Sequence, residues 1–387
     1  MAVDFERAPF LVIWEVTRAC ALACVHCRAD AIAKRDPLEL TTEEGFRLID
    51  QVRSFGTPPP LFVLTGGDPM WRKDLAELVG YASQAGLTVA LTPSGTAAVT
   101  RGRLEELKAA GLSRVAVSLD GPDAQTHDSF RRVRGSYDYT LRIIESVLEL
   151  GLPLQINSTV SRLTLPHLQS MAARVGEFPL ALWAVFFLIQ TGRGATRAQI
   201  TAEECEDVLH FLDELSRRVP FGIKTTEAPH YRRVQMQREA QGAPLAPVLG
   251  RRQLRAPRTV NDGNGFVFVD HVGKICPSGF LPLTCGNARN EALIETYRDN
   301  EVFRRLRDPE ALGGRCGRCE FRAICGGSRS RAFAATGYAF AEDPLCAWQP
   351  AEAAAAPLSG EGTGLEPSES TAAFGYQFGR RVQAARA

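Results

Sequence analysis

The first two thirds of the sequence alternate short apolar segments with longer amphipathic ones. The apolar segments are rich in β-branched residues and predict six strands, at residues 11–17, 61–65, 87–92, 113–120, 152–160 and 181–190. The segments between them show helical spacing and mostly end at a glycine, as helices do. Continuous apolar strands that alternate with helices predict a parallel sheet with both faces covered. Eight strand–helix units close a barrel of this kind, so six units predict an open, partial α/β barrel.

The composition of the chain changes twice, which predicts three parts. Residues 8–218 carry the regular alternation and form the partial (β/α)6 TIM-like barrel. Residues 219–349 lose that alternation and are richer in turn residues and cysteines, as in a small metal-organised extension. Residues 350–387 are rich in Ala, Gly, Ser and Glu, and predict a flexible tail.

Distinctive turn sequences follow most of the predicted strands. Three cysteines follow the first strand, and the sequence GGDP follows the second. PSG, DGP and QTGRG follow the third, fourth and sixth strands. In parallel α/β folds, ligands bind at the carboxyl ends of the strands. The sequence therefore predicts one binding site on that edge of the barrel.

The charge balance excludes several classes of partner. Lys and Arg total 45 and Asp and Glu total 44, for a net charge of +1. This balance gives no electrostatic reason to expect nucleic acid or an acidic membrane surface as a partner. No uninterrupted apolar run reaches about 18 residues, so we expect no membrane span. The N-terminal MAVDFERAPF has no apolar signal core, and we expect a cytoplasmic protein.

The ten cysteines are mostly clustered, which in a reducing cytoplasm indicates metal ligands rather than disulfides. Cys20, Cys24 and Cys27 lie on the loop after the first strand. Zinc sites and ordinary iron–sulfur clusters take four protein ligands. Three thiolates at this spacing can hold three irons of a [4Fe–4S] cube and leave the fourth iron open. A partial zinc site is the alternative.

This cysteine spacing, placed after the first strand and followed by GGDP, resembles the radical S-adenosylmethionine (SAM) superfamily over residues 10 to about 200. The resemblance implies that SAM binds the open iron of the cluster. Electron transfer from a donor such as ferredoxin or flavodoxin would then cleave SAM to a 5′-deoxyadenosyl radical, which abstracts a substrate hydrogen. The cofactors carry this chemistry, and the protein positions and shields them. No catalytic side chain follows from the motif.

The resemblance also implies SAM contacts near the first two strands. His26 occupies a position that is usually aromatic in the family, so it would pack near the adenine. Gly66, Gly67 and Asp68 resemble the family's GGE-type turn, which meets the SAM amino group. Asp in place of Glu shortens the reach of that acid. Taken alone, GGDP is an ordinary turn and His26 an ordinary packed histidine.

Three further SAM contacts are implied on the fourth and fifth strands. Ser118 would contact SAM, and Arg131 would pair with the SAM carboxylate, a role that suits guanidinium. Asn157 would bond the ribose or the carboxylate. The turn at 190–194 would offer backbone groups to the adenine. The alternatives are a solvated arginine run for Arg131 and a satisfied strand end for Asn157.

A second cysteine group lies in the extension, at Cys316, Cys319, Cys325 and Cys346. Four thiolates close the coordination of one iron–sulfur cube, and a zinc ribbon is the alternative. The segment resembles the SPASM extension of radical SAM enzymes, which holds up to two auxiliary [4Fe–4S] clusters. A further cysteine expected after Cys325 is absent, and Ser328 stands nearby. We therefore expect one auxiliary cluster, with Cys276 and Cys285 left over; a second cluster that uses both is the open alternative. Cys205 is expected to be a buried thiol.

Three segments of the extension, CPSGFLPL, KTTEAPHYRRV (224–234) and SRSRAFAATGYAFAEDPLC, resemble the radical SAM proteins of haem and d1-haem biosynthesis. That resemblance implies a tetrapyrrole substrate, modified by propionate decarboxylation or removal. His230 would approach an iron or carboxylate, and four arginines would bind propionates: Arg232, Arg233, Arg329 and Arg331. The alternative for these arginines is pairing with local acids. A peptide-modifying maturase and a non-catalytic iron–sulfur electron carrier are the alternative functions, and the motifs identify neither proton donor nor oligomeric state.

Overall fold

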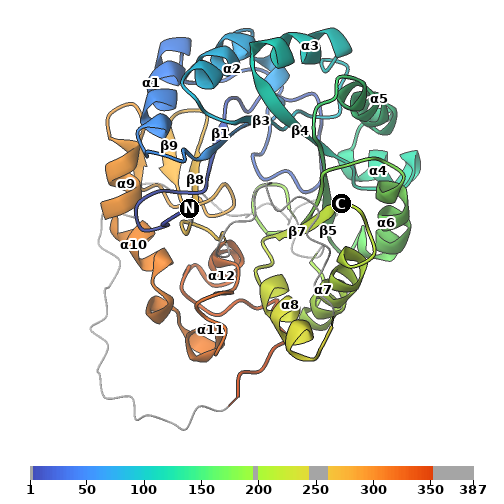
Figure 1. The fold of residues 1–387 in the computed structure, drawn as a ribbon, viewed down its shortest axis with the longest axis vertical. Coiled ribbons are helices and arrows are strands. Elements are labelled where there is room, and N and C mark those ends of the chain that lie inside the picture. The colour runs from blue at the N-terminus through green and yellow to red at the C-terminus, as the bar shows by residue number, and fades with distance from the viewer. Residues whose placement is uncertain (1–2, 195–198, 244–259, 352–387) are drawn as a thin grey trace, which may run out of the picture. The chain divides into compact units, whose positions relative to one another are not determined.

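Ten strands form one curved sheet, and helices lie along its outer side (Figure 1). The computed structural model describes residues 3–194, 199–243 and 260–351. Described residues up to 351 belong to a single unit by their contacts. The tail predicted for residues 350–387 lies almost entirely outside the described residues.

The strands follow the order β10-β9-β8-β1-β2-β3-β4-β5-β6-β7. Neighbours from β8 to β7 in this order are parallel, whereas β9 pairs antiparallel with both β8 and β10. The strands are β1 Leu11–Glu15, β2 Leu61–Thr65, β3 Val89–Leu91, β4 Leu112–Ser118, β5 Leu154–Val160, β6 Leu182–Phe187, β7 Gly222–Thr226, β8 Phe266–Val269, β9 Lys274–Cys276 and β10 Gly286–Asn287.

Helices connect the parallel strands and cover the outer side of the sheet (Figure 1). They are α1 Thr42–Arg53, α2 Leu75–Gln84, α3 Arg101–Ala110, α4 Ala124–Arg131, α5 Ser136–Glu149, α6 Leu168–Gly176 and α7 Ala202–Ser216. The extension adds α8 His230–Ala240, α9 Leu293–Asp299, α10 Glu301–Arg307, α11 Gly314–Arg318 and α12 Arg329–Thr336. Capping boxes begin α1 at Thr41 and α7 at Thr201, as their sequences require.

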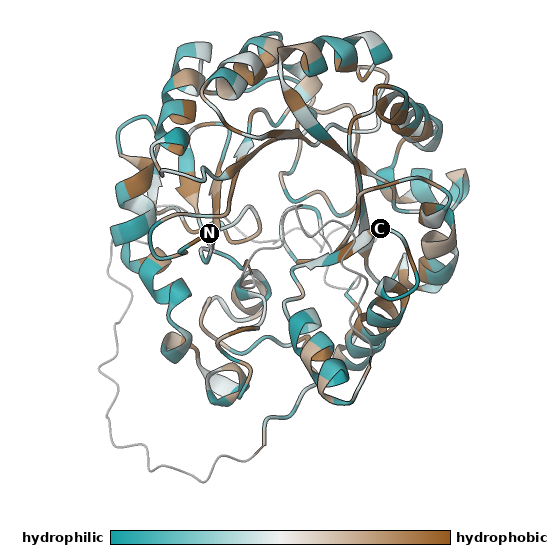
Figure 2. Ribbon diagram, viewed as in Figure 1, coloured by the Kyte–Doolittle hydropathy of each residue, from teal (hydrophilic) through white to brown (hydrophobic). Residues whose placement is uncertain are grey.

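Side chains alternate along each strand between the helices and the inner side of the sheet. On β1, Val12 and Trp14 are fully buried against the helices, while Ile13 is half-buried on the inner side. Trp183 and Val185 repeat the pattern on β6. Figure 2 shows this apolar layer, with hydrophilic residues on the outer surfaces of the helices. The layer between sheet and helices is the core, and the inner side carries polar residues such as Glu15 among apolar ones.

The predicted α/β partial barrel is confirmed, with one difference. Two strands of the extension, β7 and β8, continue the barrel sheet on its two sides, pairing in parallel with β6 and β1. The predicted boundary between residues 218 and 219 therefore falls inside one continuous sheet. The β7 sequence GIKTT is too polar to be recognised as a strand, and FVFV of β8 is only four residues long.

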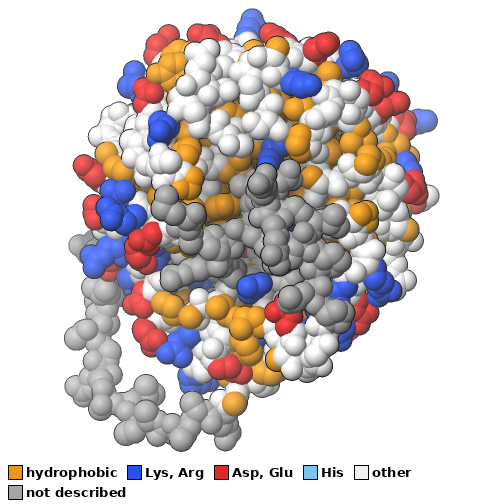
Figure 3. Space-filling model, in the orientation of Figure 1, with side chains coloured by type: hydrophobic (Ala, Val, Ile, Leu, Met, Phe, Trp, Pro, Cys, Tyr) orange, Lys and Arg blue, Asp and Glu red, His pale blue; other side chains and the backbone are white. Residues whose placement is uncertain are grey.

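Two surface findings bear on possible partners. In the described part of the chain, no helix is long and apolar enough to cross a bilayer. On the face drawn in Figure 3, acidic and basic side chains are interspersed rather than gathered by sign.

Candidate functional site

The three cysteines after β1 lie at the carboxyl end of the strand, and neighbouring loops fix the chain around each of them. The segment before Cys20 is held by the turn after β2. The Gly67 amide donates to the Thr17 carbonyl and the Asp68 amide to the Ala19 carbonyl, both at 2.7 Å. The two glycines of this turn are required because a side chain at either position would collide with the backbone of the cysteine loop. A Cβ on Gly66 would lie 2.4 Å from the Thr17 carbonyl oxygen, and one on Gly67 would lie 2.5 Å from the Ala19 carbonyl oxygen.

Cys24 is held by the end of α4. The Val25 amide donates to the Phe130 carbonyl at 3.1 Å, and the His26 ring stacks on the Phe130 ring with centroids 4.3 Å apart. Arg131 Nη1 lies 3.6 Å from the Cys24 sulfur. The sequence-predicted residues His26 and Arg131 are therefore brought together beside the second cysteine.

Cys27 is held by the turn after β6. The Arg193 amide donates to the Cys27 carbonyl at 2.9 Å. Gly192 has a φ of +58°, and a Cβ there would lie 2.3 Å from the same carbonyl oxygen. The turn at 190–194 thus contacts the cysteine loop directly. Loops after β2, β4 and β6 each fix one stretch of the cysteine loop, so the three thiols have a shared, preformed support.

Asp68 is buried, and its carboxylate is occupied within the turn. It accepts hydrogen bonds from Thr96 Oγ1 at 2.7 Å and from the Met70 amide at 3.2 Å. Burial raises the pKa of Asp68 above its ordinary value, against the effect of these bonds. Ser94 Oγ links the turn to the cluster loop, since it donates to the Gly67 carbonyl at 2.6 Å and lies 3.4 Å from the Cys20 sulfur. In this arrangement the Asp68 carboxylate braces the turn, and its contact to SAM stays a prediction.

Arg131 forms a buried ion pair with Asp120 while it contacts Cys24. Burial would lower the pKa of Arg131, but Asp120 and Cys24 raise it above its ordinary value. Asp120 also accepts from the Thr159 amide at 2.7 Å. Burial would raise the pKa of Asp120, and the Arg131 charge lowers it overall. Arg131 Nε is buried without a partner among the described residues, so the guanidinium has one donor left for a ligand.

His26 is neutral at physiological pH. Burial, together with the Arg131 charge, lowers its pKa to about 3. Its Nδ1 atom is buried and has no hydrogen-bond partner within the described ranges. A neutral ring stacked on Phe130, with a free nitrogen, fits the predicted packing role.

Ser118 and Asn157 sit side by side on the inner face of the sheet, because they are paired in the register of β4 and β5. Asn157 Oδ1 accepts a hydrogen bond from Gln155 at 2.6 Å, which fixes the orientation of the amide. No described residue accepts a hydrogen bond from the Asn157 NH2 group, which is available to a ligand on that face.

The four cysteines of the second group line one open cavity of about 400 Å³. It is also lined by His230, Arg233 and Trp348. Across residues 3–194, 199–243 and 260–351, no three His, Cys, Asp or Glu side chains meet closely enough to ligate a single metal ion. An iron–sulfur cube binds each thiolate at a different corner, so its ligands stand farther apart than those of one zinc ion. Four thiols around a shared cavity fit a cube.

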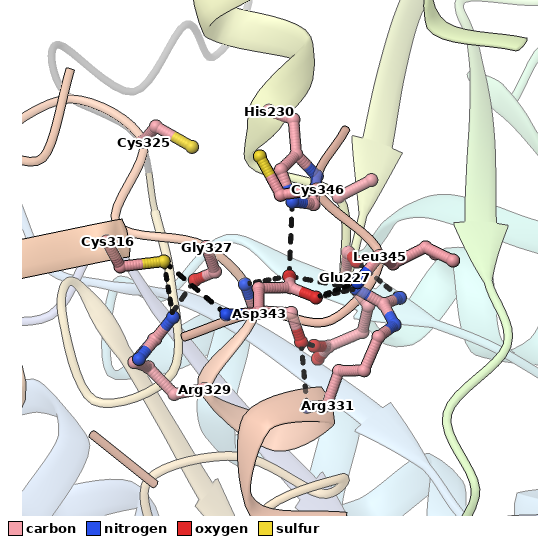
Figure 4. A network of polar contacts seen from close by, with 12 residues as sticks. Glu227, His230, Cys316, Cys325, Gly327, Arg329, Arg331, Asp343, Leu345 and Cys346 are labelled. Carbon is pink, nitrogen blue, oxygen red and sulfur yellow. Dashed lines mark hydrogen bonds and ion pairs between the residues drawn. The ribbon is translucent and has the colours of Figure 1, made fainter. Parts of the chain in front are cut away.

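Polar groups surround these thiols (Figure 4). Arg329 Nη2 lies 3.6 Å from the Cys316 sulfur, and the Asp343 amide lies 3.4 Å from it. His230 Nε2 pairs with Asp343 at 3.2 Å. Burial would raise the pKa of Cys346, but His230 lowers it below its ordinary value. Donors aimed at thiolate sulfurs are typical of iron–sulfur sites.

This arrangement corrects the expectation that Arg233, Arg329 and Arg331 bind substrate propionates. Arg329 and Arg331 are buried, and Arg331 pairs with Asp343 and donates to the Glu227 carbonyl at 2.7 Å. Arg233 is also buried and pairs with Glu206. These guanidinium groups are used to compensate buried acids and to support the auxiliary site. Arg232 is exposed on α8.

Cys276 ends β9 and Cys285 directly precedes β10, where the Cys285 amide donates to the Ile275 carbonyl at 2.8 Å. Burial raises the pKa of each thiol to about 12. Neither lines the cavity of the second cysteine group. Cys205 is buried in α7, as expected.

Two supporting groups were missed by sequence reasoning. Asp120 was noted only as part of a turn, yet it is the partner of Arg131. Arg28, next to Cys27, pairs with Glu15 at 2.7 Å, and Glu15 contacts His271 Nδ1 at 3.1 Å. An acid on the inner face of an apolar strand was the available signal for Glu15, because a buried carboxylate needs partners.

Comparisons with known proteins agree with this geometry. The family profile described as the Radical SAM superfamily matches residues 14–172. The chain is 41% identical over 357 residues to the AdoMet-dependent heme synthase of Oleidesulfovibrio alaskensis, covering 91% of each chain. It is 39% identical to the protein of the same name from Methanosarcina barkeri, over 90% of this chain and 99% of that one. The solved structure of Streptococcus suis SuiB bound to S-adenosylmethionine has a TM-score of 0.67 at 15% identity, covering 88% of this chain and 78% of that one.

Proposed function

Because this chain belongs to the radical SAM superfamily, whose members bind a [4Fe–4S] cluster and SAM, we propose that it removes propionate carboxyl groups from a tetrapyrrole. In this reaction a propionate side chain would lose a hydrogen atom to the 5′-deoxyadenosyl radical, release carbon dioxide, pass one electron to an acceptor such as an auxiliary iron–sulfur cluster, and become a vinyl group. The observation that carries the proposal is the open three-cysteine site on the barrel rim, in a chain that matches heme synthases over nine tenths of its length.

The residues at the rim fit the cluster and SAM. Three thiols on one supported loop hold the cluster: Cys20, Cys24 and Cys27. When bound, the cluster and SAM supply reductive SAM cleavage and hydrogen-atom abstraction. Arg131 holds positive charge against the Cys24 sulfur and presents Nε to the SAM carboxylate. His26 packs on the adenine, and the Asn157 amide and Ser118 hydroxyl bind the ribose side. The turn at 66–68 presents its backbone to the amino group, with Asp68 as its brace.

The second cysteine group binds one auxiliary [4Fe–4S] cluster in this proposal. Its support is the shared cavity of four thiols and the donors that surround them. Cys276 and Cys285 remain outside it. Iron and sulfide quantitation after anaerobic reconstitution tests the count: about eight irons per chain are expected from four irons per cube, and about twelve would contradict a single auxiliary cluster.

A low-potential donor such as ferredoxin or flavodoxin supplies the electron, and the reaction takes place in the cytoplasm. All ten cysteines are free thiols in the structure, which suits a reducing compartment. Replacing dithionite with reduced flavodoxin should sustain SAM cleavage, and no turnover with either ferredoxin or flavodoxin would exclude these donors.

The decisive experiment is an anaerobic assay with SAM, dithionite and iron-coproporphyrin III. The expected result is 5′-deoxyadenosine together with a porphyrin product that has lost carbon dioxide by mass spectrometry. Cys24→Ala is the matched inactive variant, and Cys205→Ala, whose thiol is buried in α7 and does not line the cavity of the second cysteine group, is the control. Formation of 5′-deoxyadenosine without binding or change of the porphyrin would reject the tetrapyrrole and favour a peptide substrate. No 5′-deoxyadenosine at all would leave only an electron-carrier role.

A further inference from the structure

The inner face of the sheet carries two basic side chains that the cluster and SAM do not use. The helix-facing residues of β4, β5 and β6 are fully buried and apolar, as at Val117, Ile156 and Trp183. The alternate residues therefore point to the inner side. Lys224 on β7 belongs to the inner set, because it is in register with Ala184 of β6, which is in register with Asn157 of β5.

One cross-strand row thus runs Ser118, Asn157, Ala184, Lys224. Residues in register on parallel strands project from the same face of the sheet. Adjacent strands lie about 4.8 Å apart, so Lys224 is about 14 Å along the sheet from Ser118. The row begins at the predicted SAM contacts and ends at a lysine. A ligand beside SAM on this face would extend toward that lysine.

The Lys224 side chain is accessible to solvent on the inner face of the sheet, and other protein atoms lie around it. Its side chain is exposed to solvent there, and it makes no hydrogen bond or ion pair with any described residue. Desolvation by the surrounding protein atoms, together with the charge of Arg114, lowers the pKa of Lys224 to about 8. The amine is therefore mostly a cation near neutral pH, and no described acid lies beside it.

Arg114 is the second cation. It lies on β4 four residues before Ser118, and so on the same inner face. Its Nε atom is buried and unpartnered among the described residues. Burial lowers the pKa of Arg114 as well. Arg114 raises the free-energy cost of charging Lys224, and an anion bound between the two cations would offset that cost.

The other charged groups nearby do not supply that anion. Glu15, the acid on the inner face of β1, is already paired with Arg28 and His271. Arg233 and Arg331, by contrast, each have an acid from the chain itself. The described part of the chain thus neutralises Arg233 and Arg331 beside the auxiliary site and supplies no counter-ion to Lys224 and Arg114.

We propose that Lys224, together with Arg114, binds a carboxylate of the substrate on the inner face of the sheet. The inference rests on the proposed function for the identity of that substrate, a tetrapyrrole that carries several propionates. The bound carboxylate anchors the macrocycle so that a different side chain faces SAM. The carboxylate of SAM is the other source of the same chemistry, and the test distinguishes the two.

The first experiment measures affinity in the reconstituted holoprotein. Lys224→Met should weaken binding of iron-coproporphyrin III by about 10- to 100-fold, the range for one charged hydrogen bond. Lys224→Arg should restore most of it, and Lys73→Met, an exposed lysine before α2, is the matched control. A Kd for the porphyrin within twofold of the wild type, or a loss confined to the Kd for SAM, would overturn the proposal.

The second experiment separates this inference from the proposed function. The chain has only five lysines, at positions 34, 73, 108, 224 and 274, so acetylation of each is readily followed by mass spectrometry. Iron-coproporphyrin III should protect Lys224 but not Lys73, and its tetramethyl ester should protect neither. If the porphyrin does not bind, tricarballylate is the probe. Protection by tricarballylate alone would retain the carboxylate site and reject the tetrapyrrole, and protection of Lys224 by no carboxylate would reject the site.

Discussion

Arg131 Nη1 lies 3.6 Å from the Cys24 sulfur while Nη2 of the same guanidinium pairs with Asp120. A carboxylate that follows β4 thereby fixes a positive charge beside one ligand of the predicted SAM-binding cluster. Asp120 is itself held by the Thr159 amide at the end of β5. The charge next to the cluster is therefore positioned by three adjacent elements of the barrel rim.

Arg131→Met should reduce SAM cleavage by at least about 10-fold, because one charged interaction of 1.5–3 kcal/mol is lost. It should also destabilise the protein by about 3–5 kcal/mol, since Asp120 is left as an unpaired buried acid. The double variant Arg131→Met, Asp120→Asn should recover stability but not cleavage. Anaerobic urea unfolding and 5′-deoxyadenosine yield are the two measurements. Recovery of both would mean that Arg131 serves only the fold.

Gly67→Ala should strongly reduce the rate of SAM cleavage. The added Cβ would lie 2.5 Å from two carbonyl oxygens, those of Arg18 and Ala19, and would displace the loop that carries Cys20. A displacement of about 1 Å costs about 100-fold in rate in a positioned site. Gly102→Ala in α3, which meets nothing within 4 Å, is the matched control. Full SAM cleavage by Gly67→Ala would show that the turn does not position the cysteine loop.

Cys346→Ser should remove one cluster and Cys276→Ser none. Cys346 lines the cavity of the second cysteine group, and His230 lowers its pKa, which favours the thiolate that iron requires. Cys276 lies outside the cavity, and burial raises its pKa to about 12. Iron should fall by about four per chain in the first variant only. Equal losses in both variants would require a second auxiliary cluster or a shared one.

The stability contributed by His271 should depend on pH. Burial alone would lower the pKa of His271, but the neighbouring Glu15 raises it above 6.5. Burial alone would raise the pKa of Glu15, but Arg28 and His271 lower it below 4.5. The His271 contribution is complete below pH 6.5 and is lost as the pH rises through its folded-state pKa. The Glu15 contribution is complete above pH 4.5 and is lost as the pH falls through its folded-state pKa.

His271→Asn should therefore cost most between pH 4.5 and 6.5, by about 1.5–3 kcal/mol, and less above that range. Free energies of unfolding in urea at pH 5.5 and 8.5, measured under argon, test the difference. His210→Asn, at a side chain that is 42% exposed, is the control. A cost that is equal at both pH values would show that the ion pair does not account for it.

Sequence reasoning recovered what depends on local pattern and spacing. The six barrel strands follow from continuous apolar segments, and the two cysteine groups follow from their spacing. The requirement for glycine at Gly66 and Gly67 was noted as a motif, but its cause is the approach of another loop, at Thr17 and Ala19. A motif within one segment identifies the glycine, but it does not show which neighbouring loop leaves no space for a side chain there.

The parts that were missed depend on contacts between distant segments. β8 is a strand because β1 offers it an edge, and four apolar residues do not reveal that. Arg329 and Arg331 looked like substrate ligands because they are basic and clustered, whereas the fold places Cys316 and Asp343 beside them. Lys224 shows the opposite case, since only the register of β7 reveals that it faces inward.

The pairing of Leu11 with Phe266 has a consequence for how the protein is made. At about 5–20 residues per second, the ribosome delivers β8 on the order of tens of seconds after β1. Until then the strand that leads into the cysteine loop has one open edge, which is a site for pairing with other chains. Until β8 is synthesised, Arg28 also lacks the Phe268 ring, whose centroid lies 4.7 Å from its guanidinium carbon in the folded protein. The three cysteines after β1 thus leave the ribosome before β8 exists, and we expect the cluster to be inserted after the extension has been synthesised.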